Sequence, residues 1–477
     1  MVNRGSASWS SGNRASAASL PSLGLLLGLI ATSDVALATS IEDSIQAALA
    51  TNPDIGVVAA DREAIDQELR QARAEYLPSV DVRGAAGPEY TDSPATRNRS
   101  GRGRNAGDSQ TLLRLESQLT LTQMLFDGFA TQSEVQRQTA RIDSAARRVQ
   151  ETAEFVALDA VEAHLEMLRN QELVELAREN VAQHRRILGQ VGLLERQGAG
   201  SLGDVRQAES RLAEAESSLA LAVGNLRDAT AFYRAVVGLP PEDLQGAVPP
   251  FAALPESEEA SAAVASATNP TVLIANADVD VAQAELRGAR AGYYPNLDLE
   301  LGASAGDDLD GIEGSDVSAQ ALVVLRYNLF RGGGDIARER EAFARLKEAR
   351  EVVRVAQRDA EEEARVAFNA LTTARARVVA LSRGVEAQRA TRDIYAQQFD
   401  LGQRGLLDLL DAENELFNDR SNLVTADLTE TFAAYRVLAV VGTLLDALSI
   451  ERPKEAISIY RERREPVRQS ITVGGPE

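Results

Sequence analysis

The side chains of this sequence that could do chemistry are mostly carboxylates. Asp408 and Asp411 lie three positions apart, a spacing that places both carboxylates on one face of a helix, close to its positively charged N-terminus. Capping of that terminus is the simplest interpretation of the pair. In a symmetric ring of several chains, however, copies of both residues would converge in a constriction that attracts cations and repels anions. The residues alone leave both interpretations open.

Other residues give little support to enzyme chemistry. The chain has no Cys, which excludes disulfides, thiolate nucleophiles and Cys-zinc sites. His164 and His184 lie on one predicted helix without an H-E-x-x-H motif, so we predict ordinary seam or surface residues and no metal site. Gly198 to Gly203 fits G-x-G-x-x-G, but a helix precedes it where a dinucleotide site needs a strand. We therefore predict no cofactor and no enzyme activity.

The charge balance argues against a nucleic acid partner. The 477 residues include 50 Lys and Arg against 71 Asp and Glu, which gives a formal net charge of −21. Binding to phosphate backbones needs clustered cationic side chains. Aromatic residues make up only 4% of the chain, which is few for several globular cores and favours long helices that pack closely through Ala.

The first 38 residues predict a cleaved secretory signal. Arg4 and Arg14 form a positive segment, Leu20 to Ala31 an apolar segment, and Ala36-Leu37-Ala38 a cleavage site of small residues. The apolar segment is too short for a membrane-spanning helix, which needs about 20 apolar residues. Since no later stretch reads as a spanning helix, entry into a membrane would require strands.

The rest of the chain is a tandem repeat. Ala50-Thr51-Asn52-Pro53 recurs as Ala267-Thr268-Asn269-Pro270, and Leu125-Phe126-Asp127-Gly128 has its counterpart in Leu329-Phe330-Arg331-Gly332. The offset between the copies is 217 residues in the first part and 204 in the second. This pattern predicts a first repeat at 39–238, a Pro-rich linker at 239–255, a second repeat at 256–448 and a tail at 449–477.

Each repeat predicts a helix, a β-hairpin and then a long helical hairpin. The β-hairpins are expected at 79–127 and 296–330, with loops rich in Gly, Asp, Ser and Arg near 88–110 and 303–315. Between positions 113 and 121 the odd residues are Leu, apart from Ser117, and the even residues are polar. Such alternation is typical of a strand with one apolar and one polar face.

The helical hairpins are expected at 129–238 and 333–448. Each begins with almost 70 residues that contain no Pro and carry apolar residues at alternating spacings of three and four. At 1.5 Å per residue such a helix would be roughly 100 Å long. At the N-terminus of the first repeat, Ser40 and Asp43 have the spacing of a capping box.

Four amphipathic strands cannot close a sheet in lipid, because open edges leave backbone groups unpaired. The smallest membrane barrels have about eight strands, so a barrel would need two, three or four chains. The alternative is a soluble coiled coil whose strands pack their Leu faces on a core. The secretory signal, the polar second faces and the repeat symmetry favour the barrel.

The two-copy plan, Tyr76-Leu77-Pro78 and Tyr293-Tyr294-Pro295 before the hairpins, Leu125 to Gly128, and above all Gly402 to Glu413 resemble the TolC family of outer-membrane efflux proteins. The resemblance covers residues 40–448. It implies a mainly α fold with a β membrane part, in which a homotrimer forms a 12-stranded barrel and a helical tunnel. It also implies an outer-membrane location and a passive exit duct for type I protein secretion or multidrug efflux.

The resemblance further implies partners. These are an inner-membrane transporter, of the ABC or the RND type, a periplasmic adaptor (membrane fusion protein) and the outer-membrane lipid. The stretch Leu406 to Leu416 and the lack of a lipidated Cys resemble the type I secretion branch. Two alternatives stay open: a soluble periplasmic scaffold or adaptor, which leaves the apolar strand faces without a purpose, and a surface hydrolase, which lacks a catalytic constellation.

The site residues follow from the same resemblance. Asp408 and Asp411 match the family's acidic ring at the periplasmic entrance, and Arg404 and Asp204 match positions that are linked when the entrance is closed. A solvated Arg404 is the alternative to that link.

The gate departs from the family pattern at two positions. Phe399 stands where some family members have a tyrosine, and Gly203 where a hydroxyl-bearing residue can precede the aspartate. We therefore expect a weaker or differently connected gate. The turns expected to dock the adaptor are marked by four glycines: Gly198, Gly200, Gly402 and Gly405.

Overall fold

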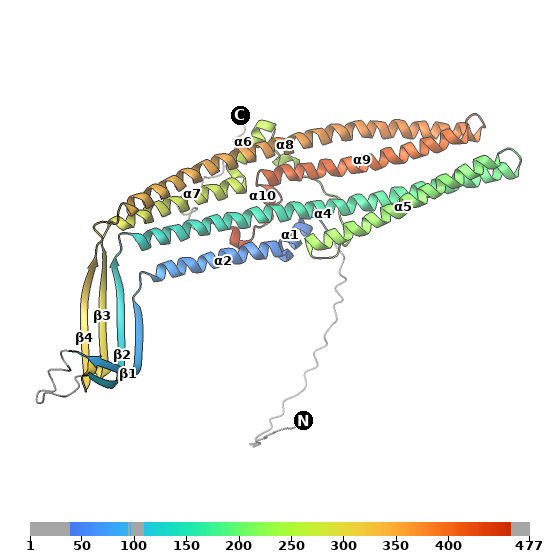
Figure 1. The fold of residues 1–477 in the computed structure, drawn as a ribbon. Coiled ribbons are helices and arrows are strands. Elements are labelled where there is room, and N and C mark those ends of the chain that lie inside the picture. Colours follow the sequence, from blue (N-terminus) through green and yellow to red (C-terminus); the bar gives the residue numbers. More distant parts are fainter. Residues whose placement is uncertain (1–38, 94–95, 97–108, 459–477) are drawn as a thin grey trace, which may run out of the picture. The chain divides into compact units, whose positions relative to one another are not determined.

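The structure, a computed structural model, consists of long helices and one four-stranded antiparallel sheet (Figure 1). It describes residues 39–93, 96 and 109–458. The predicted signal peptide at 1–38 and the part of the predicted tail beyond residue 458 lie outside the described residues. A mainly helical chain with a small antiparallel sheet confirms the coarse fold class expected from the sequence.

The same order of elements occurs twice. The first copy consists of α1 (Ile41–Thr51), α2 (Pro53–Ala74), β1 (Ser79–Asp92), β2 (Ser109–Phe126), α4 (Ala130–Arg196) and α5 (Leu202–Val237). The second consists of α6 (Glu258–Thr268), α7 (Pro270–Ala289), β3 (Asn296–Asp307), β4 (Ser315–Arg326), α8 (Gly334–Asp400) and α9 (Leu406–Val440), followed by the short α10 (Leu444–Ala447).

The single helix expected at the start of each repeat is in fact two helices. Asn52 ends α1 and caps α2, and Asn269 does the same between α6 and α7. In both cases the Asn side chain accepts a hydrogen bond from a backbone N–H, and the Pro that follows occupies the first helical position, where its missing N–H costs nothing. The capping box of Ser40 and Asp43 is confirmed, with both of its hydrogen bonds present.

The sheet has the strand order β1-β2-β3-β4, so the two hairpins pair through β2 and β3. Residues opposite each other in the register share a face. One row across all four strands is apolar and consists of Val80, Leu121, Leu301 and Ala321, and the next consists of Val82, Leu119, Ala303 and Ala319.

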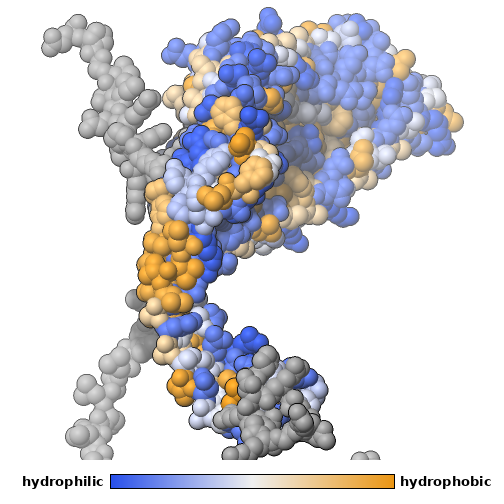
Figure 2. Space-filling model, turned by 60° about the vertical axis from the view of Figure 1, so that its left-hand side comes forward, coloured by the Kyte–Doolittle hydropathy of each residue, from blue (hydrophilic) through white to orange (hydrophobic). Residues whose placement is uncertain are grey.

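The apolar face of the sheet is exposed. Val82 is 78% exposed and Val323 63%, and no helix or strand of the described chain covers this face. Figure 2 shows a hydrophobic patch over the strands beside a hydrophilic strip. The opposite face is polar: Arg326 on β4 forms ion pairs with Asp298 and Glu300 on β3, at N–O distances of 2.7 and 2.6 Å.

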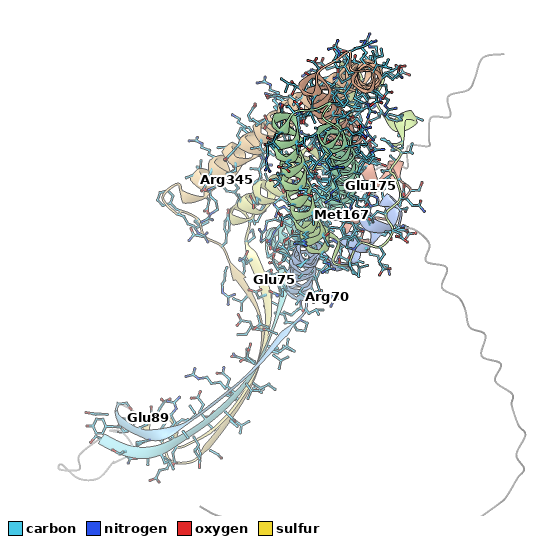
Figure 3. All side chains as sticks on the ribbon, turned by 90° about the vertical axis from the view of Figure 1, so that its right-hand side faces the viewer. Arg70, Glu75, Glu89, Met167, Glu175 and Arg345 are labelled. Carbon is cyan, nitrogen blue, oxygen red and sulfur yellow. The ribbon has the colours of Figure 1, made fainter. Side chains whose placement is uncertain are left out.

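The outer edges of the sheet are free. Within the described chain, β1 pairs only with β2 and β4 only with β3. An edge strand presents a row of unpaired N–H and C=O groups. Glu75 lies where α2 meets the sheet, and Glu89 lies near its other end, where it pairs with Arg114 (Figure 3).

The loop predicted near 88–110 is shorter than expected, because residues 88–92 lie in β1. The loop predicted near 303–315 is also shorter, and the prediction is wrong for residues 303–307. These residues belong to β3, and they pair with β2 on one side and β4 on the other. Small residues favour loops in isolation, but here two neighbouring strands supply the hydrogen bonds that fix the extended backbone.

The long helices α4 and α8 contain 67 residues each. α4 packs against α2, α5, α7 and α9, and α8 against α6, α7 and α9. The core is built from small side chains, and Ala153, Ala157 and Ala160 on α4 are fully buried. No helix in the described part of the chain is both long and apolar enough to cross a membrane.

Candidate functional site at the helical turns

The predicted gate residues lie around two turns, α4–α5 and α8–α9. Figure 1 shows both turns at the ends of the helical hairpins that point away from the sheet. Gly198 and Gly402 have φ values of +76° and +70°, which glycine adopts without strain and which let the chain reverse. Gly405 is the N-cap of α9, and Gly200 lies so close to Glu195 that an added Cβ would come within 3.1 Å of its backbone nitrogen.

Asp204 has a local partner. Its carboxylate accepts a hydrogen bond from the backbone N–H of Ser201, and the Ser201 hydroxyl accepts one from the backbone N–H of Asp204. The two residues form a capping box at the start of α5. This cap was not predicted, although Ser201 and Asp204 have the same S-x-x-D spacing as Ser40 and Asp43.

Arg404 is held on its own hairpin. Its Nη1 lies 3.3 Å from Asp408 Oδ2, and its Nε donates to Gln398 Oε1 at 2.8 Å. The guanidinium also stacks 3.7 Å from the centre of the Tyr395 ring. Three side chains of the same hairpin therefore position Arg404, while its own side chain is 30% exposed.

The structure does not pair Arg404 with Asp204 within the described chain. Arg404 binds Asp408, and Asp204 caps α5. A link between these two residues could therefore form only between copies of the chain or in a different conformation.

Asp411 joins the two hairpins. Its Oδ1 lies 3.1 Å from Nη2 of Arg211 on α5. The side chains of Asp408 and Asp411 are both 51% exposed. Each carboxylate therefore has one Arg partner and also contacts solvent. Arg211 was missed because no local motif relates it to a residue 200 positions later in the chain.

Phe399 is part of an apolar cluster that joins the same two hairpins. It packs against a buried cluster drawn from both hairpins, which consists of Ile187, Val191, Ala208, Leu406, Leu409 and Leu410. A phenyl ring fits this cluster without a hydroxyl group, and the aromatic contact with Arg404 comes from Tyr395, four positions earlier.

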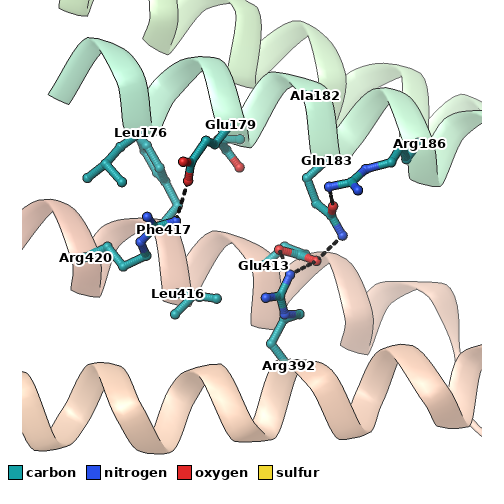
Figure 4. A pocket seen from close by; sticks show the side chains of 11 residues that line it. Leu176, Glu179, Ala182, Gln183, Arg186, Arg392, Glu413, Leu416, Phe417 and Arg420 are labelled. Atoms are coloured by element: carbon teal, nitrogen blue, oxygen red, sulfur yellow. Dashed lines mark hydrogen bonds and ion pairs between the residues drawn. The ribbon is translucent and has the colours of Figure 1, made fainter. Parts of the chain in front are cut away.

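A second contact between the hairpins lies in a cavity of about 540 Å³ between α4, α8 and α9 (Figure 4). Glu413, which is 5% exposed, accepts hydrogen bonds from Gln183 Nε2 at 2.6 Å and from Arg392 Nη1 at 3.1 Å. At the rim, Arg420 Nη1 lies 2.7 Å from Glu179 Oε2. No local sequence pattern predicts this network, since its members come from three separate helices.

The two histidines are buried on α4. His164 bonds Ser44 Oγ through Nδ1 and the Gln245 carbonyl through Nε2, both at 2.9 Å. Burial lowers the pKa of His164 and also that of His184. The distance between Ser44 Oγ and His164 Nδ1 would suit a nucleophile and its base. Both residues are buried away from solvent, however, so we interpret the pair as structural. No group of three or more His, Cys, Asp or Glu among the described residues could hold a metal ion.

A buried carboxylate, Glu154, lies on α4 ten positions before His164. Glu154 is 2% exposed and accepts a hydrogen bond at 3.1 Å from the backbone N–H of Leu444, at the start of α10. Arg452 Nη2 is 3.7 Å from its other oxygen. Burial raises the pKa of Glu154 to about 7, and the charge of Arg452 only partly offsets that effect.

Comparison with known proteins identifies relatives along nearly the whole chain. The family model described as outer membrane efflux protein matches residues 44–239 and 263–443. The chain is 26% identical to the outer membrane efflux protein BepC of Brucella suis, over 92% of this chain and 94% of that protein.

Two further relatives and a solved structure are also outer membrane or secretion proteins. The chain is 23% identical to the outer membrane protein TolC of Escherichia coli, over 88% of this chain and 86% of that protein. It is 26% identical to the alkaline protease secretion protein AprF of Pseudomonas aeruginosa, over 86% of each. The fold is similar to that of the outer membrane protein VceC from Vibrio cholerae, with a TM-score of 0.69 and 17% identity over 87% of this chain and 97% of that one.

Proposed function

The chain belongs to the outer membrane efflux protein family, and on this premise we propose that it forms a passive exit duct through the outer membrane and periplasm. The family resemblance drawn from the sequence is thereby confirmed, together with the outer-membrane location. The relatives are named as outer membrane or secretion proteins, which agrees with the prediction that the chain is a transport protein and not an enzyme.

The observation that carries the proposal is the sheet. One of its faces is apolar and exposed, and neither edge strand has an outer partner in the described chain. Hydrocarbon accepts an apolar face but not a row of unpaired backbone groups, each of which costs several kcal/mol. Sister copies that pair β4 of one chain with β1 of the next would satisfy both requirements. Three copies would give a closed 12-stranded barrel.

The polar face of the sheet would then line the lumen. It carries the ion pairs of Arg326 with Asp298 and Glu300, side chains that suit a water-filled channel. The helical hairpins would extend this lumen as a tunnel into the periplasm, with the α4–α5 and α8–α9 turns at its entrance.

We place the gate at these turns. Copies of Asp408 and Asp411 around a trimer would form an acidic ring, whose charge Arg404 and Arg211 offset within each chain. The link of Arg404 to Asp204 is proposed between neighbouring copies in the closed state. Such an exposed pair is worth only about 0–1 kcal/mol, but three copies acting together could bias an opening equilibrium.

The turns are also the proposed docking tips for a periplasmic adaptor and an inner-membrane transporter. Their exposed apolar side chains, Leu202, Leu401 and Leu407, suit an interface with another helical protein. Type I protein secretion is the favoured route, because the chain matches a protease secretion protein along most of its length. An ABC transporter is the matching partner, and an RND pump would serve multidrug efflux.

Engineered disulfides test the closure of the sheet. The chain has no Cys, so Ala86→Cys on β1 combined in turn with a Cys at position 317, 319, 321 or 323 on β4 introduces the only thiols. Oxidation of outer membranes should give covalent trimers for at least one combination, since a disulfide needs Cα atoms within about 7 Å. The single-Cys variants serve as controls. Monomers from all four combinations would contradict the proposal.

A further inference from the structure

A small cavity of about 240 Å³ lies where the sheet meets the helices. Its wall is formed by the start of α4, the end of α7 and the segment that follows α7. The side chains used in the argument below are Phe129, Gln132, Gln136, Arg287, Arg290 and Tyr294. Liquid water occupies about 30 Å³ per molecule, so the cavity has room for a group much larger than one water.

The charge of the cavity is unlike that of the chain. Two guanidinium groups line it and no carboxylate does, although the chain as a whole carries a net charge of −21. Arg290 donates through Nε to Glu339 at 2.8 Å, while Arg287 is exposed and forms no ion pair in the part of the chain that the structure describes. The N-terminal end of α4 adds little to this charge, because the Asp127 carboxylate already accepts a hydrogen bond from the Thr131 N–H at 2.6 Å.

Phe129 has an unusual backbone. Its φ of +70° is left-handed, a conformation that is strained for a bulky side chain. Its ring is 53% exposed and makes edge-on contacts with Phe126 and Tyr294, at centroid distances of 5.4 and 6.0 Å. An exposed aromatic side chain thus occurs at a position whose backbone disfavours it.

The repeat shows that this strain is not required by the fold. The residue equivalent to Phe129 in the second repeat is Gly333, which has a φ of +84° and adopts it freely. Likewise, Leu77 in the first repeat stands where Tyr294 stands in the second. Phe129 of the first repeat and Tyr294 of the second both line the cavity, whereas their repeat equivalents, Gly333 and Leu77, are not aromatic.

The cavity lies at the end of the apolar face. The β-bulge between Met124 and Phe126 shifts the register of β2, so that Phe126 pairs with Leu297 of the apolar face. Phe126, Phe129 and Tyr294 therefore continue that face up to the two arginines.

We propose that this cavity binds the phosphodiester headgroup of a membrane phospholipid, with the acyl chains along the exposed strands. Guanidinium groups bind phosphate oxygens through paired hydrogen bonds, and aromatic rings suit the boundary between hydrocarbon and water. The inference rests on the proposed function, because it places the strands in lipid.

The test uses native mass spectrometry of the full chain in dodecyl maltoside, with phosphatidylglycerol as the probe and inorganic phosphate in a separate arm. The wild type should bind one lipid per chain. Arg287→Ala should raise the apparent Kd about tenfold, because its paired hydrogen bonds are lost. Phe129→Gly should also weaken binding while the chain stays folded, as it copies the residue of the second repeat.

Arg70→Ala is the matched control. Arg70 is the repeat equivalent of Arg287, is exposed and lines no part of this cavity, so its loss should leave the Kd unchanged. Equal affinity in the wild type and Arg287→Ala would overturn the proposal. Displacement of the lipid by millimolar inorganic phosphate would show a site for the free ion and would overturn it as well.

Conductance of the same preparations separates this inference from the proposed function. Channels that conduct while all variants bind lipid equally would refute only the lipid site. A wild type that binds no lipid and conducts no ions would refute both.

Discussion

At the scale of single residues, the carboxylates at the turns are less isolated than the sequence indicates. Asp408 and Asp411 each have an Arg within 3.3 Å, so a ring of copies would be partly neutralised. The field at such a constriction depends on the difference between its acids and its bases. Arg211 thus becomes as relevant to ion selectivity as the aspartates.

This balance predicts that removing the acids and removing a base have opposite effects on block by cations. Replacing both Asp408 and Asp411 with Ala should weaken block by trivalent cations, because the attracting charges are removed. Arg211→Ala should strengthen block by several-fold, since it unmasks Asp411. Single-channel recording measures both effects, and Arg206→Ala, on an exposed arginine paired with Glu209, is the control. Block that is unchanged in both variants would refute the acidic ring.

Glu154 predicts a pH dependence of stability. Its pKa is raised by burial from 4.5 to about 7, so the folded state favours the protonated form. The stability that this group contributes is complete below pH 4.5 and is lost as the pH rises to about 7, a change on the order of 3 kcal/mol.

The Glu154→Gln variant should lack this loss, since an amide keeps the hydrogen bond to the Leu444 N–H without the charge. Thermal unfolding of the wild type and the variant at pH 4.5 and pH 8 is the measurement. As the pH rises from 4.5 to 8, the unfolding temperature of the wild type should fall relative to that of the variant. Parallel pH profiles would show that Glu154 does not titrate in this range.

Local contacts between residues could be predicted from the sequence, and distant ones could not. The S-x-x-D spacing contains all the information needed for the caps at Ser40 and Ser201, because the partners are three positions apart. The pairs Arg211–Asp411 and Gln183–Glu413 depend on how two hairpins pack, which no local pattern records. The sequence therefore indicated the acids of the site but not the groups that hold them.

At the scale of elements, the sheet and the long helices could be predicted because their periods are strong. Alternating Leu residues indicated β2, and spacings of three and four indicated α4 and α8. The pairing of β2 with β3 joins the two repeats and has no sequence signal of its own. The breaks at Asn52 and Asn269 have a signal in Asn-Pro, because Asn is a good N-cap and Pro fits the first position of a new helix.

The contact between α4, α8 and α9 at Glu413 predicts a role in holding the hairpins together. Glu413→Ala would leave Arg392 without its nearly buried partner, which should destabilise the chain by about 1–3 kcal/mol. The same loss should increase the open probability of the channel, since the hairpins separate more easily.

Arg420→Ala is the control for this contact. It removes an exposed ion pair between the same hairpins, which is worth about 0–1 kcal/mol. Denaturant unfolding and single-channel recording test the two effects. If Glu413→Ala behaves like Arg420→Ala in both measurements, the contact at Glu413 does not hold the hairpins together.

At the scale of the whole molecule, the proposal is that one chain is incomplete without its copies. In the described residues its strands expose an apolar face and two edges without a partner strand. The helices α4 and α8, of 67 residues each, are far longer than a single core requires. Both features are explained if copies of the chain complete each other, the strands in lipid and the helices around a common lumen.

The most direct test of this claim combines mass and conductance in one preparation. The protein purified from outer membranes in detergent should have the native mass of a trimer. The same sample should insert into planar lipid bilayers and give discrete single-channel steps. A monomer that stays in solution without detergent and never conducts ions would contradict the account.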